Sequence, residues 1–377
     1  MSVLQRFRFL VLPCYLIFIL ILSGCNDFYR NRSHPEISNA DIKDGKALAT
    51  VYCQGCHQLP DPSLLSVIAW EKGVLPYMGP RLGVFSYKFQ RYPSSRYDKF
   101  LDKNFYPSQP LVTADEWRKI VAYYIATSPD SMAGQQRDYS IKSVLPLFQP
   151  VIPALSYANP TISYVNIDTN YGKRSVLLAD VIKKNLLRLN SRFETVDSVA
   201  VGGPVVNLDI HPGEITVCDI GMLNPSDGKF GRAERISFPQ NKMMMDTFPL
   251  FDLLARPVQI TAADLNHDGR MDYVVCEFGN LTGALSWMEN DGNNQYTRHV
   301  ITPVPGAIKA YVSDVNRDGL PDLWVLFAQG DERISLFTNL GKGNFSERKV
   351  LQFPPSYGSS YFEFADFNKD GRNNRLE

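Results

Sequence analysis

The sequence has no excess of charge and few cysteines, and both shortages limit what the protein can be. Its 377 residues carry 39 basic and 39 acidic side chains, so the formal net charge is zero. Proteins that bind nucleic acid usually present a basic surface, and this composition gives no support for one. Of the six cysteines, only Cys53 and Cys56 form a Cys-x-x-Cys pair. A structural zinc site needs two further cysteine or histidine ligands, and no second pair supplies them.

Long hydrophobic runs are also scarce, and the most prominent one lies at the N-terminus. Arg6 and Arg8 precede an apolar run over residues 9–22, and the sequence Leu-Ser-Gly-Cys25 follows at its end. A basic start followed by such a run is typical of a secretory signal. The run is shorter than the ~20 residues of a spanning helix, although an uncleaved membrane helix is the alternative.

The four residues that end at Cys25 resemble the lipobox of bacterial lipoproteins. The resemblance implies a signal peptide over residues 1–24, cleavage before Cys25 and acylation of that cysteine. Because several acyl chains give stable anchoring, we expect a lipid-anchored protein of the cell envelope, on the periplasmic or the surface side.

Residues 53–57 read Cys-Gln-Gly-Cys-His, the attachment pattern of a c-type haem. The pattern predicts that Cys53 and Cys56 bond the haem as thioethers and that His57 is the proximal iron ligand. Met78, which lies between two prolines, is the candidate sixth ligand, with a core methionine as the alternative. Covalent haem attachment takes place outside the cytoplasm, so the export signal and the haem motif support each other.

Two helices are predicted on either side of the haem motif. Ser38 or Asn39 can cap a helix that ends at Tyr52, and Gly45 within it would allow a second helix to approach closely. The second helix starts at a capping box, Thr113 with Glu116, and continues with apolar residues at helical spacing up to residue 125. This arrangement resembles class I cytochromes c. The resemblance implies a small all-α cytochrome c domain over residues 38–130, after a linker over residues 25–37.

Cys14 lies within the predicted signal peptide, and the last two cysteines, Cys218 and Cys276, lie in apolar, strand-like runs. We expect them to be buried free thiols, which behave as small hydrophobic side chains. A disulfide between them is the alternative in an exported protein.

Three related nonapeptides begin at Asp264, Asp314 and Asp366, about fifty residues apart. That period matches one four-stranded blade of a β-propeller. Each nonapeptide has oxygen-bearing side chains at alternate positions and glycine at the sixth, a pattern suited to calcium. An EF-hand is excluded because position twelve is Val275 or Val325 instead of glutamate.

The predicted calcium ligands are Asp264, Asn266, Asp268, the Arg270 carbonyl and Asp272 in the first loop, and Asp314, Asn316, Asp318, the Leu320 carbonyl and Asp322 in the second. The third loop, with Asp366, Asn368 and Asp370, is predicted to bind more weakly because Asn374 replaces its last acid. Tight Asx turns between strands are the alternative for all three loops.

The loops and the apolar strands that follow them resemble the FG-GAP or VCBS repeats of β-propellers. The resemblance implies an all-β propeller over residues 155–377, preceded by a linker over residues 131–154. Asp168 and Asp209 are interpreted as the starts of degenerate loops in earlier blades. The chain stops three residues after Asn374, and only four or five partial blades are found, so we expect an incomplete propeller.

These features predict a membrane-anchored c-type cytochrome. It would carry electrons through covalent haem c to a redox partner protein, which a calcium-stabilised propeller would dock. One alternative is a haem-fused propeller oxidoreductase acting on a small substrate, although the sequence shows no recognisable quinone site or acid/base cluster. The other is an extracellular propeller that binds glycans or proteins, since fold alone does not determine function.

Overall fold

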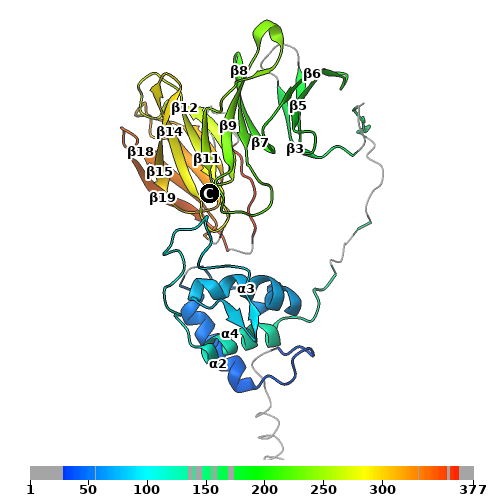
Figure 1. Ribbon diagram of the computed structural model, residues 1–377, viewed down its shortest axis with the longest axis vertical. Helices are drawn as coiled ribbons and strands as arrows, with labels where there is room; N and C mark the ends of the chain where they lie inside the picture. The colour runs from blue at the N-terminus through cyan, green and yellow to red at the C-terminus, as the bar shows by residue number, and fades with distance from the viewer. Residues whose placement is uncertain are drawn as a thin grey trace, which may run out of the picture. The chain divides into compact units, whose positions relative to one another are not determined.

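The structure is a computed structural model that describes residues 29–364, apart from residues 56, 135–138, 141–146, 154, 156–158, 169–173, 330 and 355–356. The chain divides into two compact units (Figure 1), the first drawn from residues up to Asp138 and the second mainly from Tyr139–Glu377. Among the described residues, none of the helices has the length and apolar character needed to span a membrane.

The first unit contains short helices, helical turns and a hairpin. In chain order they are α2 (Asn39–Tyr52), the 3-10 turn η1 (Pro62–Leu64), the π-helical turn η2 (Ala69–Val74), α3 (Leu75–Met78), the 3-10 turn η3 (Gly79–Leu82), strands β1 (Ser86–Tyr87) and β2 (Gln90–Arg91), and α4 (Ala114–Thr127).

The two longest helices of this unit begin at the predicted caps. The Ser38 side chain accepts a hydrogen bond from the amide of Asp41 at the start of α2. At the start of α4, Thr113 and Glu116 form the complete capping box. The two helices pack against each other around a core that includes Ile42, Trp117 and Ile120. The sequence therefore predicted both helices correctly.

The prediction of a small all-α domain is wrong. The chain between α2 and α4 forms short helical turns and the β1–β2 hairpin, and the described residues do not form a distinct all-α cytochrome domain. The hairpin turn uses Lys88 and Phe89 with positive φ angles of 45° and 65°. The strands on either side of this turn have two residues each, too few to show the alternation that identifies strands in a sequence.

The described residues of the second unit form four antiparallel sheets, each built from consecutive strands. The first sheet comprises β3 (Ile162–Asp168), β4 (Ser175–Asp180), β5 (Asn185–Leu189) and β6 (Thr195–Ala200). The second comprises β7 (Val205–His211), β8 (Glu214–Asp219), β9 (Gly231–Ser237), β10 (Met244–Met245) and β11 (Phe251–Leu254), with a 3-10 turn η4 (Pro239–Asn241). The third comprises β12 (Pro257–Ala263), β13 (Asp272–Glu277), β14 (Ala284–Gly292) and β15 (Gln295–Thr302). The fourth comprises β16 (Ala307–Ser313), β17 (Asp322–Phe327), β18 (Arg333–Asn339) and β19 (Phe345–Gln352).

The sheets pack face to face in chain order, and the second strand of the later sheets is buried on both faces. All six residues of β13 and of β17 are buried, and their side chains form cores with the neighbouring sheets. Strands buried on both faces read as continuous apolar runs, which explains the runs that follow the repeated loops.

The sheets form an open array and are not arranged as a closed propeller, so the prediction of an all-β propeller fold, made as an incomplete one, is also wrong. The apolar side chains of Val165 and Ile167 on β3 are exposed, whereas a sheet that closed a ring against β3 would cover them. Whether the sheets close into a ring depends on which part of the chain packs against the first sheet. The fifty-residue period of the sequence does not specify that part.

Candidate functional site

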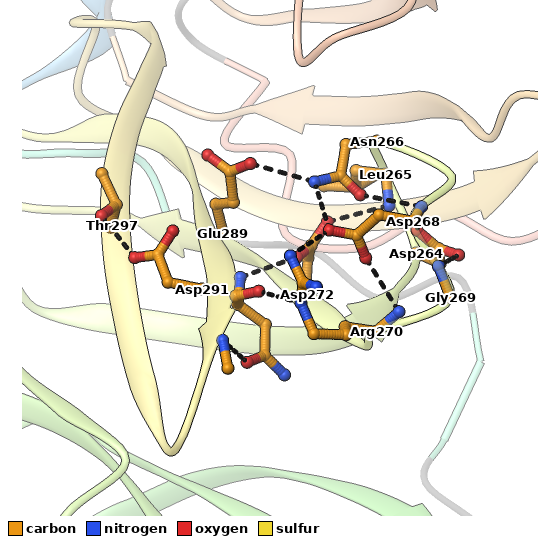
Figure 2. A network of polar contacts seen from close by, with 12 residues as sticks. Asp264, Leu265, Asn266, Asp268, Gly269, Arg270, Asp272, Glu289, Asp291 and Thr297 are labelled. Atoms are coloured by element: carbon orange, nitrogen blue, oxygen red, sulfur yellow. Dashed lines mark hydrogen bonds and ion pairs between the residues drawn. The ribbon is translucent and has the colours of Figure 1, made fainter.

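The first repeated loop connects β12 to β13 and is held by its own side chains (Figure 2). The carboxylate of Asp264 accepts hydrogen bonds from the amides of Asp268 (3.0 Å) and Gly269 (2.8 Å). Asn266 Oδ1 also accepts from the Asp268 amide, at 3.2 Å. Gly269 has a φ angle of 83°, a left-handed conformation that glycine adopts without a steric penalty.

The second loop, between β16 and β17, has the same geometry. The carboxylate of Asp314 accepts from the amides of Asp318 (3.2 Å) and Gly319 (2.9 Å), and Asn316 Oδ1 accepts from Asp318 at 3.0 Å. Gly319 has a φ angle of 87°. The repetition shows that the shared sequence pattern produces one defined loop structure.

The last acid of each loop binds backbone amides and is fully buried. Asp272 accepts from the amides of Leu265 (3.1 Å) and Asn290 (2.8 Å), so it ties the loop to β14. Burial raises the pKa of Asp272 above its ordinary value. Asp322 likewise accepts from the amides of Val315 (3.0 Å) and Asn339 (2.8 Å). Each carboxylate therefore connects the loop before it to a later strand by hydrogen bonds.

The predicted calcium ligands thus lie together in two equivalent loops, where they form Asx-type hydrogen bonds. Within the part of the chain that the structure describes, no three acidic, histidine or cysteine side chains are grouped as a metal site. The carboxylate and amide oxygens are nevertheless the hard donors that calcium prefers, and an oxygen that accepts one hydrogen bond keeps a second lone pair. Calcium binding by these loops stays a prediction. The third loop, Asp366 to Asn374, lies outside the described residues.

Two side chains on β14 and β15 are connected to the first loop by polar contacts, and the sequence did not predict them. Asn266 Nδ2 donates to Glu289 Oε1 at 3.0 Å (Figure 2), and Glu289 Oε2 lies 2.7 Å from His299 Nε2. The His299 ring stacks on Trp287 with 4.7 Å between the ring centroids. Glu289 and His299 lie well beyond the end of the nonapeptide at Asp272, and the pairing of β14 with β15 brings the two side chains together.

The two earlier acids that were interpreted as degenerate loop starts belong to strands. Asp168 is the last residue of β3, and Asp209 lies within β7. Asp209 Oδ2 accepts from the amide of Ala262 in the next sheet (2.6 Å) and lies 2.9 Å from His211 Nε2. Asp209 therefore fastens one sheet to the next.

The Cys-x-x-Cys-His motif follows α2 directly. Cys53 is the C-cap residue, its amide donates to the Ala49 carbonyl (2.8 Å), and its half-buried side chain packs against the apolar core of the first unit. Cys56 lies outside the described residues. His57 Nδ1 lies 2.8 Å from the carbonyl oxygen of Gln58. A carbonyl can only accept, so a ring with its hydrogen on Nδ1 fits this contact, and a neutral ring of that form would leave Nε2 to bind iron.

Met78 ends α3, and its half-buried side chain packs against the same apolar core as Cys53. Gly79, next to it, has no room for a side chain, because a Cβ there would lie 2.5 Å from the Tyr92 ring. The chain beside Met78 is therefore closely packed, and Met78 as the sixth iron ligand stays a prediction.

The segment after the motif is held by two aromatic side chains. Trp70 Nε1 donates to the Pro62 carbonyl at 2.8 Å, and the Tyr124 hydroxyl donates to the Pro60 carbonyl at 3.3 Å. The centroids of the two rings lie 4.5 Å apart in the core, so Trp70 packs the interior of the first unit.

The remaining cysteines are buried in strands of the second unit. Cys218 and Cys276 are free thiols that are 0% and 1% exposed. Burial raises the pKa of Cys276 to about 12 and that of Cys218 well above its usual range. This agrees with the preferred interpretation from the sequence. Cys25 lies outside the described residues.

Comparison with known proteins supports the repeat interpretation for the C-terminal part. The FG-GAP-like repeat family matches residues 264–325 and 314–374. No curated protein matches the chain.

Two solved structures show weak likeness. A luciferin-regenerating enzyme is 10% identical, with a TM-score of 0.31, and the match covers 50% of this chain and 60% of that one. A protein assigned as dipeptidyl aminopeptidase IV from Bacteroides ovatus is 12% identical, with a TM-score of 0.29, and the match covers 52% of this chain and 30% of that one. Likeness at this level carries no argument about function. The loops and sheets therefore define a β-repeat protein in which residues 264–374 match FG-GAP-like repeats.

Proposed function

We propose that the protein is an exported binding protein whose FG-GAP-like sheets hold a protein partner. The observation that supports this most directly is the repeated loop, which has the same hydrogen-bonded structure at Asp264 and at Asp314 within the matched region. Loops supported by a rigid scaffold are common positions for recognition.

Partner capture from the membrane fraction of the source cells tests this proposal. The full chain should retain a protein that a variant with Asp264→Ala and Asp314→Ala loses. Asp291→Ala is the matched control, because Asp291 lies on the exposed β14–β15 hairpin and contacts only Thr297 among the residues drawn in Figure 2. Identical captured proteins from all three chains would contradict the proposal, and binding to a glycan array alone would favour a carbohydrate ligand.

A second candidate function is electron transfer through covalent haem c. Three observations support it: the contact of His57 Nδ1 with the Gln58 carbonyl, the packing of Cys53 and Met78 against one apolar core, and the close packing at Gly79 beside Met78. Cys53 and Cys56 would hold the haem by thioether bonds, and His57 with Met78 would be the axial ligands. The haem would supply one-electron chemistry, and the apolar surroundings would exclude water from it. The electrons would pass to a redox partner protein at the membrane.

The haem proposal is tested with protein exported by a host that attaches haem c. The full chain should show a haem c spectrum in both oxidation states and should keep its haem after denaturation in detergent. Cys53→Ala combined with Cys56→Ala should abolish covalent haem, whereas Cys218→Ala should keep it. Covalent haem that persists in the Cys53/Cys56 variant would contradict the proposal.

We also propose that Cys25 is acylated and anchors the protein in the cell envelope. The support is the basic start, the apolar run and the small residues before the cysteine. Metabolic labelling with a fatty acid should mark the full chain and should not mark Cys25→Ala. Equal labelling of both chains would contradict the anchor.

A further inference from the structure

The hairpin formed by β1 and β2 carries an aromatic side chain at its tip. Tyr87 pairs with Gln90, so Lys88 and Phe89 form the two-residue turn. The Phe89 side chain is fully exposed, at 109% of its reference area. Single exposed apolar residues are ordinary on protein surfaces, so exposure alone assigns no role to Phe89. The backbone of the turn, the support of the hairpin and its charge add the argument.

The turn has a backbone conformation that its residues do not favour. Lys88 and Phe89 both have positive φ angles, 45° and 65°. Hairpin turns of this kind favour glycine, asparagine and aspartate, because a Cβ crowds the backbone there. A bulky aromatic residue in this conformation is uncommon. Since the exposed ring adds little to the packing of the fold, a function outside the fold explains the residue better.

The base of the hairpin is firmly attached to the first unit. Tyr87 and Tyr92 pack against the apolar core of that unit. The Tyr92 amide donates to the Phe85 carbonyl at 2.9 Å, and the Tyr92 hydroxyl accepts from Trp117 Nε1, also at 2.9 Å. The tip is therefore held in a fixed position on the surface, as a recognition loop requires.

The part of the chain around the tip is basic. Residues 72–96 contain five basic side chains and no acidic one, although the whole chain has no net charge. Lys88 and Arg91, on either side of Phe89, are exposed. An aromatic tip between two cations suits the interface of an anionic membrane, where a ring enters the acyl boundary and cations meet lipid phosphates.

The proposed acylation of Cys25 brings such a surface within reach. Asn31 is fixed to the end of α4, since its amide donates to the Ala126 carbonyl (3.0 Å) and its Nδ2 donates to the Ser128 carbonyl (2.8 Å). Cys25 lies six residues before Asn31, which corresponds to a chain length of about 20 Å at most. An acylated Cys25 therefore keeps the first unit at the membrane surface.

The hairpin tip lies near the segment that leads from Cys25 into α2. The pKa of Glu36 in this segment is held below its ordinary value mainly by a hydrogen bond with its own backbone, then by His34, with Lys88 as a further positive charge. Lys88 is thus close enough to the segment to act on its charge. The tip and the segment share one region of the surface of the first unit.

We propose that the β1–β2 hairpin inserts Phe89 into the anionic membrane that holds the acyl anchor, with Lys88 and Arg91 at the lipid phosphates. The inference rests on the proposed acylation of Cys25, which supplies the first contact with the membrane. An acyl chain and a basic patch together attach a protein more firmly than either alone. The second contact also restricts the rotation of the first unit about its anchor.

Replacing Phe89 with tryptophan tests the insertion directly. The full chain with Phe89→Trp is mixed with vesicles of phosphatidylcholine and phosphatidylglycerol, with and without bromine on the acyl chains. Bromine quenches the tryptophans that it contacts, so the emission should fall in the brominated vesicles. The four native tryptophans are 7% exposed or less and are shielded from lipid: Trp70, Trp117, Trp287 and Trp324. Val51→Trp is the matched control, at an exposed position (69%) near the far end of α2 from Glu36, and should keep its emission.

The basic side chains provide a second measurement. Each basic side chain near an anionic surface changes the association constant about fivefold. Lys88→Gln and Arg91→Gln, added to the Phe89→Trp chain, should therefore remove most of the quenching. Vesicles of phosphatidylcholine alone should quench the Phe89→Trp chain less than the anionic vesicles do. Quenching that is indifferent to both changes would overturn the role of the two cations.

Quenching at residue 89 and fatty-acid labelling of Cys25 report the hairpin and the anchor separately. Labelling of Cys25 together with equal emission of the Phe89→Trp chain in both kinds of vesicle would overturn the inference and leave the anchor in place. Quenching without labelling would support the hairpin and contradict the anchor. Equal quenching of the Val51→Trp control, or a protein that the wild type captures and Phe89→Ser loses, would also overturn the inference.

Discussion

The carboxylate of Asp322 binds the amide of Asn339 at 2.8 Å, and Asn339 Nδ2 in turn donates to the Leu265 carbonyl of the preceding repeat at 2.8 Å. Two consecutive repeats are therefore joined through a buried acid and a buried amide. Both side chains are almost completely inaccessible to water, so neither can replace a lost partner with solvent.

Replacing Asp322 with alanine should destabilise the second unit. The substitution leaves the buried amides of Val315 and Asn339 without acceptors, at a cost of roughly 1–3 kcal/mol for each unsatisfied group. Urea unfolding followed by circular dichroism should show this loss. Asp291→Ala, on the exposed hairpin, should change the free energy of unfolding by less than about 0.5 kcal/mol. Equal effects of the two substitutions would show that the hydrogen bonds accepted by Asp322 contribute little to the stability of the fold.

Replacing Gly45 with alanine should loosen the pairing of α2 and α4. A Cβ at Gly45 would lie 2.0 Å from the carbonyl oxygen of Lys119, so the two backbones must move apart. Overpacking of this kind costs about 1–3 kcal/mol. Gly73→Ala is the matched control, because no atom lies within 4 Å of its Cβ position. Thermal melting of the two variants should show a lower Tm for Gly45→Ala only.

Chelation should lower the Tm of the second unit if the loops bind calcium. The wild type should melt at a lower temperature with a chelator than with calcium, because a ligand that binds only the folded state stabilises it. Asp268→Ala combined with Asp318→Ala should remove the difference, whereas Asp291→Ala should retain it. The same Tm with and without the chelator would show that the loops act as Asx turns alone.

Cys218 and Cys276 should resist alkylation in the native protein. The thiolate is the reactive form, and burial raises the pKa of Cys276 to about 12 and that of Cys218 well above its usual range. Mass spectrometry of the two peptides should show no label before unfolding and complete label in urea. A disulfide-linked peptide, or rapid labelling of the native protein, would contradict the buried free thiols.

The first unit should lose stability in acid through the pair formed by Asp41 and Arg118. The hydrogen bond from Arg118 (2.8 Å) is the main cause that holds the pKa of Asp41 below its ordinary 3.8. A depressed folded-state pKa means that the pair stabilises the fold above pH ~4 and that this contribution is lost as the pH falls through the folded value. Urea midpoints at pH 7 and pH 3 should differ less for Arg118→Gln than for the wild type. Lys72→Gln, a change to an exposed residue of η2, should leave the difference unchanged.

The sequence carried enough information for local features and too little for the contacts between sheets. The capping box at Thr113 and the loops at Asp264 and Asp314 were predictable because each depends on residues within one turn of the chain. Asp209 was misassigned because an acid that binds a neighbouring sheet has the same sequence context as an acid that starts a loop. The exposure of Val165 could not be predicted either, because it depends on whether another sheet lies against β3.

The uniform register of the first strands has a consequence for how such a chain changes over evolutionary time. The described first strands β3, β7, β12 and β16 pair in one register, so duplication or deletion of about fifty codons would add or remove one sheet and keep that register at the remaining junctions. Length can therefore vary in whole repeats without new interfaces having to arise, whereas an insertion of a few residues within a first strand would misalign the side chains that meet the next sheet.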